Sequence, residues 1–282
     1  MIVEPVSQTA MLTAAARAAE RGRTHPLFDD PFAELLAGRQ GHDLLMRVGL
    51  DVAVPSIAIR TRYFDDVVRA ARTARGVTQF VLLGAGLDTR AYRMHLPSSG
   101  WYEVDWPPVL AYKRGLLEQT GARPTVALRH VAMDVLDDAL FPELAATGLD
   151  WQRPILWVAE GLFAFLEQYS VEKLLVAIAR HSCAGSEILF DVPNAACGRG
   201  EGDIAAAAEV LRSCGFRFAT DAPMALAQRL GFRTMVVHER HPLVHHERRG
   251  GQPMETLPIG QWAIYYVHGV LPTNRIGQTA TL

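Results

Sequence analysis

The stretch FVLLGAGLDTRAYRM, residues Phe80 to Met94, decides the fold, because an apolar run stops abruptly at two glycines. Four consecutive apolar residues at 80–83 predict a strand that is buried on both faces of a sheet. In open α/β sheets, ligands bind beyond the carboxyl ends of such strands. Gly84 and Gly86 carry no side chain, so the backbone there can turn tightly and approach a ligand closely. A Gly-x-Gly pair alone is a weak signal, since glycine also ends many strands for structural reasons.

Short β-type runs alternate with helical patterns after residue 76, and this alternation predicts a mostly parallel sheet. We expect strands near 78–83, 100–104, 126–131, 154–159, 185–192, 232–239 and 261–268. We expect helices near 107–119, 136–146, 169–182, 203–213 and 223–230. The last two strands are joined by a long segment without a helical pattern, which favours an antiparallel pair. The predicted fold class is therefore α/β, with a seven-stranded, mostly parallel sheet and one reversed edge.

Residues 1–76 differ from the rest of the chain, because Ala and Arg recur there at helical spacing, as in AMLTAAARAAERGR. We expect a helical cap at 1–76 that packs as one compact unit with an α/β domain at 77–282. A packed cap is favoured over a membrane-binding face. The neighbouring acids Asp65 and Asp66 are expected on a solvated helix face.

The composition excludes several classes of protein. A net charge of −2 and a pI near 6.6 argue against nucleic acid or an anionic membrane as a partner. Charged residues interrupt every apolar stretch before the roughly 20 residues that a membrane span needs, and the N-terminus lacks the pattern of a secretion signal. Cys183, Cys197 and Cys214 are few and widely spaced, which suits reduced thiols and predicts a cytoplasmic protein.

The second predicted strand indicates the class of ligand. It ends in Glu103 and Asp105, about 20 residues after the glycines, where an acid can accept hydrogen bonds from ribose hydroxyls. This arrangement fits NAD or S-adenosyl-L-methionine. Asp88 distinguishes the two, because its negative charge lies where a dinucleotide would place its diphosphate. S-adenosyl-L-methionine has no phosphate and carries a positive sulfonium, so the acidic loop favours it over NAD.

Several ordered motifs resemble those of a known family. LLGAGLDTRAYRM, YEVDWPPVLAYKRGLL, VAMDVLDD and WVAEGLFAFLEQYSVEKLL, with RTHPLFDDPFAELL and IRTRYFDD before them, resemble the leucine carboxyl methyltransferase-like family. That family includes protein phosphatase carboxyl methyltransferases and tetracenomycin-type polyketide O-methyltransferases. The resemblance runs from about Arg17 to Asp191 and is loose from Pro193 onward. It implies a class I methyltransferase with a Rossmann-like, seven-stranded sheet whose last strand is antiparallel.

The resemblance also implies a site for S-adenosyl-L-methionine and its product S-adenosyl-L-homocysteine. Arg60, with Arg62 as the neighbouring candidate, is expected to pair with the carboxylate of the cofactor, and Arg17 to assist. Phe165 stands where the family often has a tyrosine, so recognition of the substrate is expected to differ. The other implied contacts are Gly84, Ala85 and Gly86 at the methionine portion, Asp105 at the ribose, Asp134 and Val135 at the adenine, and Glu160 near the amino group and the methyl-transfer site.

Each of these residues also has a purely structural interpretation. Arg60 could be a solvated helix arginine, and Asp134 could cap the helix that follows it. Glu160 could be a strand-end acid in solvent, but an unpaired carboxylate within WVAEGLFAF would be costly, which favours function. Asp88 and Arg90 could pair with each other locally and contact no ligand.

Four histidines, His238, His241, His245 and His246, lie close together before the last predicted strand. A surface loop is favoured over a zinc site, since no cysteine pair accompanies them. We therefore predict no metal, although one of these histidines could reach a substrate pocket.

The resulting functional hypothesis is an enzyme that transfers a methyl group to a carboxylate or phenol oxygen of a small molecule, in secondary metabolism. A carboxylate is already ionised near neutral pH and needs no general base, whereas a phenol would need one, such as a histidine. No base is evident in the matched motifs. The alternatives are a non-catalytic protein that binds S-adenosyl-L-methionine, a methyltransferase acting on a protein's C-terminal leucine, and, disfavoured by Asp88, a nicotinamide-dependent oxidoreductase.

Overall fold

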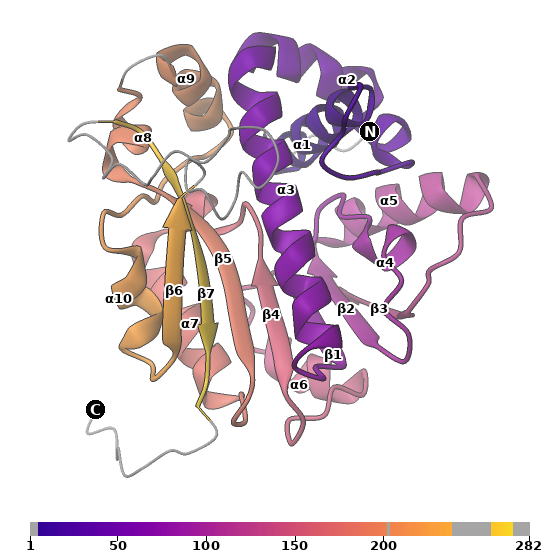
Figure 1. The fold of residues 1–282 in the computed structure, drawn as a ribbon, viewed down its shortest axis with the longest axis vertical. Helices are drawn as coiled ribbons and strands as arrows, with labels where there is room; N and C mark the ends of the chain where they lie inside the picture. The colour runs from indigo at the N-terminus through magenta and orange to yellow at the C-terminus, as the bar shows by residue number, and fades with distance from the viewer. Residues whose placement is uncertain (1–4, 202–203, 239–260, 273–282) are drawn as a thin grey trace.

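The computed structural model describes residues 5–201, 204–238 and 261–272. At its centre is a seven-stranded sheet in the order β3-β2-β1-β4-β5-β7-β6 (Figure 1). Strands β1 to β5 pair in parallel, whereas β7 is antiparallel to both β5 and β6. The predicted fold class, including its reversed edge, is confirmed. The strands are β1 (Gln79–Leu83), β2 (Gly100–Asp105), β3 (Ala127–Ala132), β4 (Ile155–Ala159), β5 (Glu187–Pro193), β6 (Arg233–His238) and β7 (Ile264–Val270).

The five helices predicted after residue 76 lie within two residues of their ranges except at one start, and two short helices, at 90–93 and 195–199, were not predicted. The helix expected at 136–146 begins later, because Asp134 accepts a hydrogen bond from the backbone N–H of Leu136 at 2.9 Å and so closes a turn instead of capping a helix. The helices are α1 (Pro5–Arg21), α2 (Ala33–Val48), α3 (Leu50–Thr73), α4 (Arg90–Arg93), α5 (Pro107–Gln119), α6 (Leu140–Ala146), α7 (Gln168–Arg180), α8 (Ala195–Arg199), α9 (Ala205–Ser213) and α10 (Pro223–Gln228), with a 3₁₀ turn η1 at Phe163–Phe165.

Helices cover both faces of the sheet, which explains why β1 is buried along its whole length. On one face, Phe64 and Val68 of α3 pack with Phe80 and Leu82 of β1. On the other face, side chains of α6, α7 and α10 pack against Val81, Leu83 and residues of the neighbouring strands. Burial on both faces is the physical reason for the consecutive apolar residues of β1.

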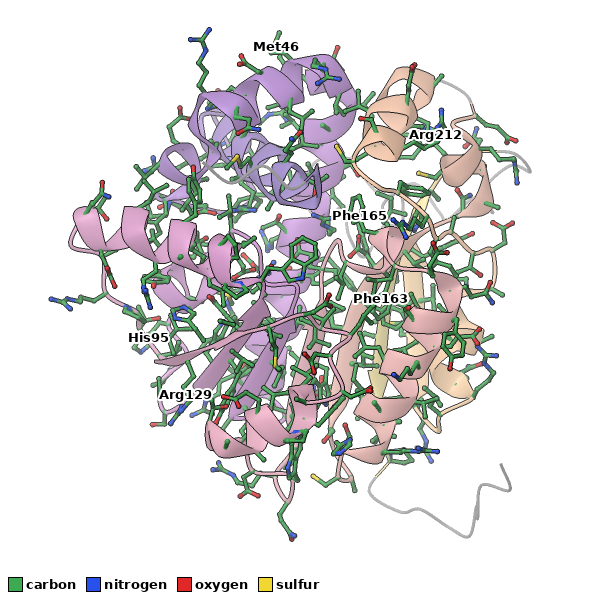
Figure 2. The ribbon with its side chains drawn as sticks, turned by 180° about the vertical axis from the view of Figure 1, so that it is seen from behind. Met46, His95, Arg129, Phe163, Phe165 and Arg212 are labelled. Carbon is green, nitrogen blue, oxygen red and sulfur yellow. The ribbon has the colours of Figure 1, made fainter. Side chains whose placement is uncertain are left out.

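A cap closes the end of the sheet at which the parallel strands finish. Helices α1, α2 and α9 and the first half of α3 gather there (Figure 1) and share one apolar cluster, which includes Leu12, Leu45, Ile57 and Val210. Helix α3 continues from this cap onto the face of the sheet, so one helix joins both parts. Met46 lies at the outer tip of the cap, whereas Phe165 lies where the cap meets the sheet (Figure 2). None of the described helices is long and apolar enough to cross a membrane.

The expectation of a solvated Asp65–Asp66 pair is wrong for Asp65. Its carboxylate is only 2% exposed and lies between Arg90 and Arg93, whose Nε and Nη1 atoms donate to it at 2.7 and 2.6 Å. Asp66 agrees with the expectation, since its side chain is 44% exposed and pairs with Arg62 and a second arginine of α3. The two acids point to different sides of α3, and only one side faces the loop after β1.

Candidate cofactor site

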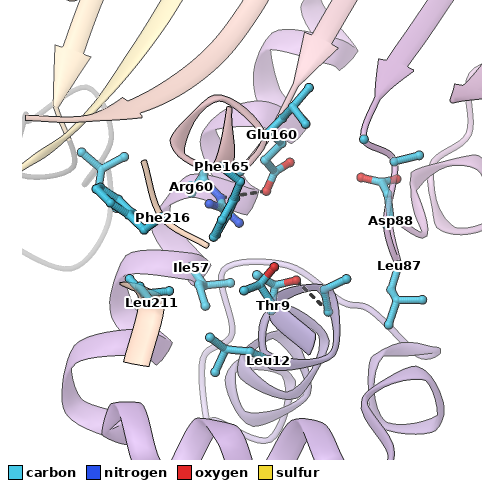
Figure 3. A pocket seen from close by; sticks show the side chains of 18 of the residues that line it. Thr9, Leu12, Ile57, Arg60, Leu87, Asp88, Glu160, Phe165, Leu211 and Phe216 are labelled. Carbon is cyan, nitrogen blue, oxygen red and sulfur yellow. Dashed lines mark hydrogen bonds and ion pairs between the residues drawn. The ribbon is translucent and has the colours of Figure 1, made fainter. Parts of the chain in front are cut away.

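One cavity of about 460 Å³ lies between the carboxyl ends of the strands and the cap (Figure 3). This volume is typical of a site for a small molecule or cofactor. The cavity brings together all but one of the residues that the sequence assigned to a site: Arg17, Arg60, Gly84, Ala85, Gly86, Asp105, Asp134, Val135, Glu160 and Phe165. The exception is Arg62, which instead donates to Asp66 and to the carbonyl oxygen of Leu27 and lines a separate polar hollow.

The glycines after β1 form the floor of this cavity. Gly84 and Gly86 have φ angles of 63° and 50°, in the left-handed region that favours glycine. A Cβ atom on Gly84 would come within 2.9 Å of the Leu162 side chain, so any larger residue would displace it. The N–H of Gly86 donates to Asp105 Oδ2 at 2.6 Å, and this bond ties the loop to the end of β2.

Asp105, not Glu103, is the acid of β2 that faces the cavity. Its Oδ1 accepts the N–H of Trp106 at 2.7 Å, and burial raises the pKa of its carboxyl above the usual value. Glu103 is fully buried elsewhere, paired with Lys113 at 2.7 Å. Each Asp105 oxygen has a further lone pair, so the carboxylate can still accept hydrogen bonds from a ribose.

We expect Asp105→Asn to weaken binding of S-adenosyl-L-homocysteine by about 1–3 kcal/mol, because an amide loses the charge and one acceptor position. Calorimetric titration measures the affinity, and thermal unfolding shows whether the variant keeps its fold. Unchanged affinity in a folded Asp105→Asn protein would place the ribose contact elsewhere.

Arg60 reaches the cavity from α3 and is held by two carboxylates. Its Nε donates to Glu160 at 3.0 Å and its Nη1 to Asp191 at 3.1 Å. Among the described residues, we find no acceptor bonded to Nη2. Nη2 therefore keeps its two N–H donors for a further carboxylate.

Arg90 links three carboxylates at the centre of the site. Its guanidinium pairs with Asp65, with Asp88 and, at 2.7 Å, with Glu160, while its Nη2 donates to the carbonyl oxygen of Thr61 at 3.3 Å. The local pair of Asp88 with Arg90, one of the alternatives that the sequence left open, is present, and both residues line the cavity. This pair is one part of a larger buried network. Through it, Arg90 holds the loop after β1 against Asp65 of α3 and Glu160 at the end of β4.

Arginines and acids line the cavity in equal number. Arg17 extends the network on the cap side, where its Nε donates to Asp30 at 2.8 Å and its Nη2 to the carbonyl oxygen of Leu87 at 2.7 Å. Counted over the described lining, four arginines lie beside four acids: Arg17, Arg60, Arg90 and Arg217, and Asp88, Asp105, Asp134 and Glu160. The lining therefore offers partners for a ligand that carries both signs of charge, and Asp88 in the loop after the glycines opposes a diphosphate.

Glu160 is poorly suited to remove a proton. Burial by itself would raise the pKa of its carboxyl, but the neighbouring guanidinium groups of Arg90 and Arg60 outweigh burial and lower it. A carboxylate that is stabilised by two cations is a weak base. Its position supports a role in orienting Arg60 and in facing a positive group of the ligand.

Sequence reasoning missed Asp191, which is buried near the carboxyl end of β5. Its Oδ1 accepts the N–H of Gly161 at 2.6 Å, and its Oδ2 accepts Arg60. Burial raises the pKa of Asp191 above the usual value, against the opposing effect of Arg60. An acid at the end of a buried strand is the signal that identified Asp105, and it could have identified Asp191 as well.

The predicted histidine cluster contributes nothing to the described lining. His241, His245 and His246 lie outside the described residues, and His238 ends β6. Within the described ranges, the cavity is lined by no histidine, lysine or tyrosine side chain.

Comparisons with known proteins indicate a methyltransferase, in agreement with the residues that line the cavity. The family model described as leucine carboxyl methyltransferase matches residues 10–179. A Mycobacterium tuberculosis protein named "Putative S-adenosyl-L-methionine-dependent methyltransferase" is 40% identical over 207 residues, which cover 67% of this chain and 66% of that protein. The chain thus spans slightly less than two thirds of that relative.

Two solved structures share the fold. A DUF574 family protein from Streptomyces avermitilis has a TM-score of 0.64 at 18% identity, covering 94% of this chain and 97% of that one. A "putative methyltransferase" from Thermobifida fusca has a TM-score of 0.57 at 20% identity, covering 93% and 94%. At this level of identity, the similarity concerns the fold alone.

Proposed function

The chain belongs to the leucine carboxyl methyltransferase family, and from that premise we propose that it transfers a methyl group to a carboxylate oxygen of a small molecule. Its cofactor is S-adenosyl-L-methionine, as predicted from the sequence. The observation that carries the choice of a carboxylate is the absence of an uncommitted base among the described cavity residues. An acceptor that is already ionised needs none.

The residues of the cavity fit this cofactor. S-adenosyl-L-methionine carries one carboxylate and two positive groups, the ammonium and the sulfonium, and the lining offers both arginines and acids to meet them. Arg60 would hold the carboxylate, Glu160 would face the ammonium, and Asp105 would accept from the ribose hydroxyls. Val135, beside the end of β3, offers an apolar contact for the adenine ring. When bound, the cofactor supplies a methyl group activated by the sulfonium.

The chain's own contribution is positioning and exclusion of water. The buried arginines and acids fix Arg60 and the glycine loop in one arrangement before any ligand binds. The cap covers the cavity with side chains of α1, α3 and α9, so an acceptor oxygen there would be shielded from solvent. Orientation of this kind contributes several kcal/mol to catalysis without any acid or base.

We expect the rate of methyl transfer at saturating cofactor to be nearly flat with pH above about 6. A carboxylate with a pKa near 4 is then fully ionised, and no group of the enzyme has to lose a proton. The measurement is transfer of labelled methyl to a panel of aromatic and aliphatic acids and phenols.

A rate that rises as the pH passes through the pKa of a base would instead indicate a phenol as acceptor, if a single His→Ala change removes that rise. Tight cofactor binding without turnover over the whole panel would point to a non-catalytic protein. Preferential turnover of a peptide with a C-terminal leucine would indicate that the acceptor is a protein. Membership of the tetracenomycin-type branch, with a role in secondary metabolism, stays a prediction.

A further inference from the structure

We propose that the acceptor has an apolar body with a single carboxylate, and that this body binds between η1, α3 and the segment after α9. The inference rests on the methyl transfer proposed above. It concerns the part of the cavity formed by Ile57, Phe165, Leu211 and Phe216, which we call the apolar end.

The apolar end presents large apolar side chains that the protein leaves partly uncovered. Phe165, Leu211 and Phe216 are only half-buried, although residues of their kind are usually covered in a folded protein. All three line the cavity. In Figure 3, Leu211 and Phe216 lie on the opposite side of the cavity from Leu87 and Asp88. Apolar surface that converges in a concave site favours an apolar ligand.

Hydrogen bonds hold this end in shape. The backbone N–H groups of Arg217 and Phe218 both donate to the carbonyl oxygen of Ala164, at 2.7 and 3.1 Å. These bonds fasten the segment that carries Phe216 to the turn that carries Phe165. The backbone therefore positions the two aromatic rings, and ordering them on ligand binding costs little free energy.

The charged groups beside the apolar end are already paired. Arg60 and Glu160 pair with each other where this end meets the network, and Arg217, exposed at the rim, donates to Glu167 at 3.0 Å. A second charge on the body of the acceptor would lose its hydration, and Arg60 would not compensate it, because its remaining donors are assigned to the carboxylate of the cofactor. The apolar end thus selects against dicarboxylates and polar peptides.

Calorimetry on the full chain saturated with S-adenosyl-L-homocysteine tests the proposal with three probes: hexanoate, decanoate and decanedioate. Decanoate should bind at least about tenfold more tightly than hexanoate, because each buried methylene contributes a factor of roughly two to four. Decanedioate has the same length and differs from decanoate by a charge at the far end. It should bind at least about tenfold more weakly than decanoate.

Variants locate the effect at the apolar end. Leu211→Glu should weaken decanoate binding at least about tenfold, and the milder Leu211→Ala by about three- to tenfold, while S-adenosyl-L-homocysteine binds as before. Met46→Glu is the matched control, because Met46 is 66% exposed at the outer tip of the cap. It should change neither affinity.

The outcomes separate this inference from the proposed function. Failure of the wild-type chain to bind S-adenosyl-L-homocysteine contradicts the proposed function itself. The chain could bind S-adenosyl-L-homocysteine and yet bind decanoate and decanedioate with equal affinity, or bind neither acid. Either result overturns the proposal for the apolar end and leaves the proposed function intact. So does a Leu211→Ala protein that binds decanoate as tightly as the wild type.

Discussion

Arg90→Ala is expected to lower the free energy of unfolding by about 3–5 kcal/mol, the largest loss of stability that we predict for a single substitution. The guanidinium is 2% exposed and is shared by Asp65, Asp88 and Glu160. Its removal leaves three carboxylates near one another with fewer cations to compensate them. Urea denaturation of the wild type and the variant measures the difference.

Arg62→Ala is the matched control for this experiment. Arg62 also pairs with an aspartate, but its side chain is 35% exposed and the pair with Asp66 lies within one helix. Pairs of this kind contribute less than about 1 kcal/mol. A loss below about 1 kcal/mol for Arg90→Ala, equal to that of the control, would show that the buried network does not depend on Arg90.

Arg60→Ala is expected to weaken binding of S-adenosyl-L-homocysteine by about 3 kcal/mol or more, roughly a hundredfold, because two charge-assisted hydrogen bonds to the ligand's carboxylate are lost. The same substitution also removes one partner of Glu160, which keeps Arg90, and one of Asp191, which keeps the N–H of Gly161. The two effects can be separated with 5′-methylthioadenosine, which has the nucleoside and the sulfur but no amino-acid portion.

Both ligands are titrated into the wild type and into Arg60→Ala. The four affinities form a cycle in which one change is the substitution and the other is removal of the amino-acid portion of the ligand. If Arg60 binds the carboxylate, Arg60→Ala should reduce the affinity for S-adenosyl-L-homocysteine strongly and the affinity for 5′-methylthioadenosine little. Arg62→Ala should leave both nearly unchanged, since Arg62 lies outside the cavity. Equal losses for the two ligands would mean that Arg60 supports the site only through its protein partners.

The sequence predicted the sheet well because each strand carries a local signal. Consecutive apolar residues such as those at 80–83, followed by glycines, are typical of a strand covered on both faces, and β1 is such a strand. The start of α6 was harder, because an aspartate before an apolar residue fits a helix cap and a turn equally well. Asp134 closes a turn, and only the path of the chain beyond it decides between the two.

The candidate site was predictable where motif position fixes a backbone or an end of a strand, as at Gly84 and Asp105. The partners of charged side chains were not predictable, because pairing depends on segments that are distant in the sequence. Asp65 and Asp66 are neighbours with the same charge, yet one is buried and the other solvated. Asp191 meets Arg60 across 131 positions, a contact that no local pattern encodes.

Calorimetric titration of the wild-type chain with S-adenosyl-L-homocysteine and with NAD is the most direct test of a cavity built for S-adenosyl-L-methionine. Arg60, Asp105 and Glu160 predict saturable, one-site binding of S-adenosyl-L-homocysteine in the micromolar range, and Asp88 in the loop after the glycines predicts no binding of NAD. Saturable binding of NAD, with no response to S-adenosyl-L-homocysteine, would contradict the site described for Arg60, Asp105 and Glu160.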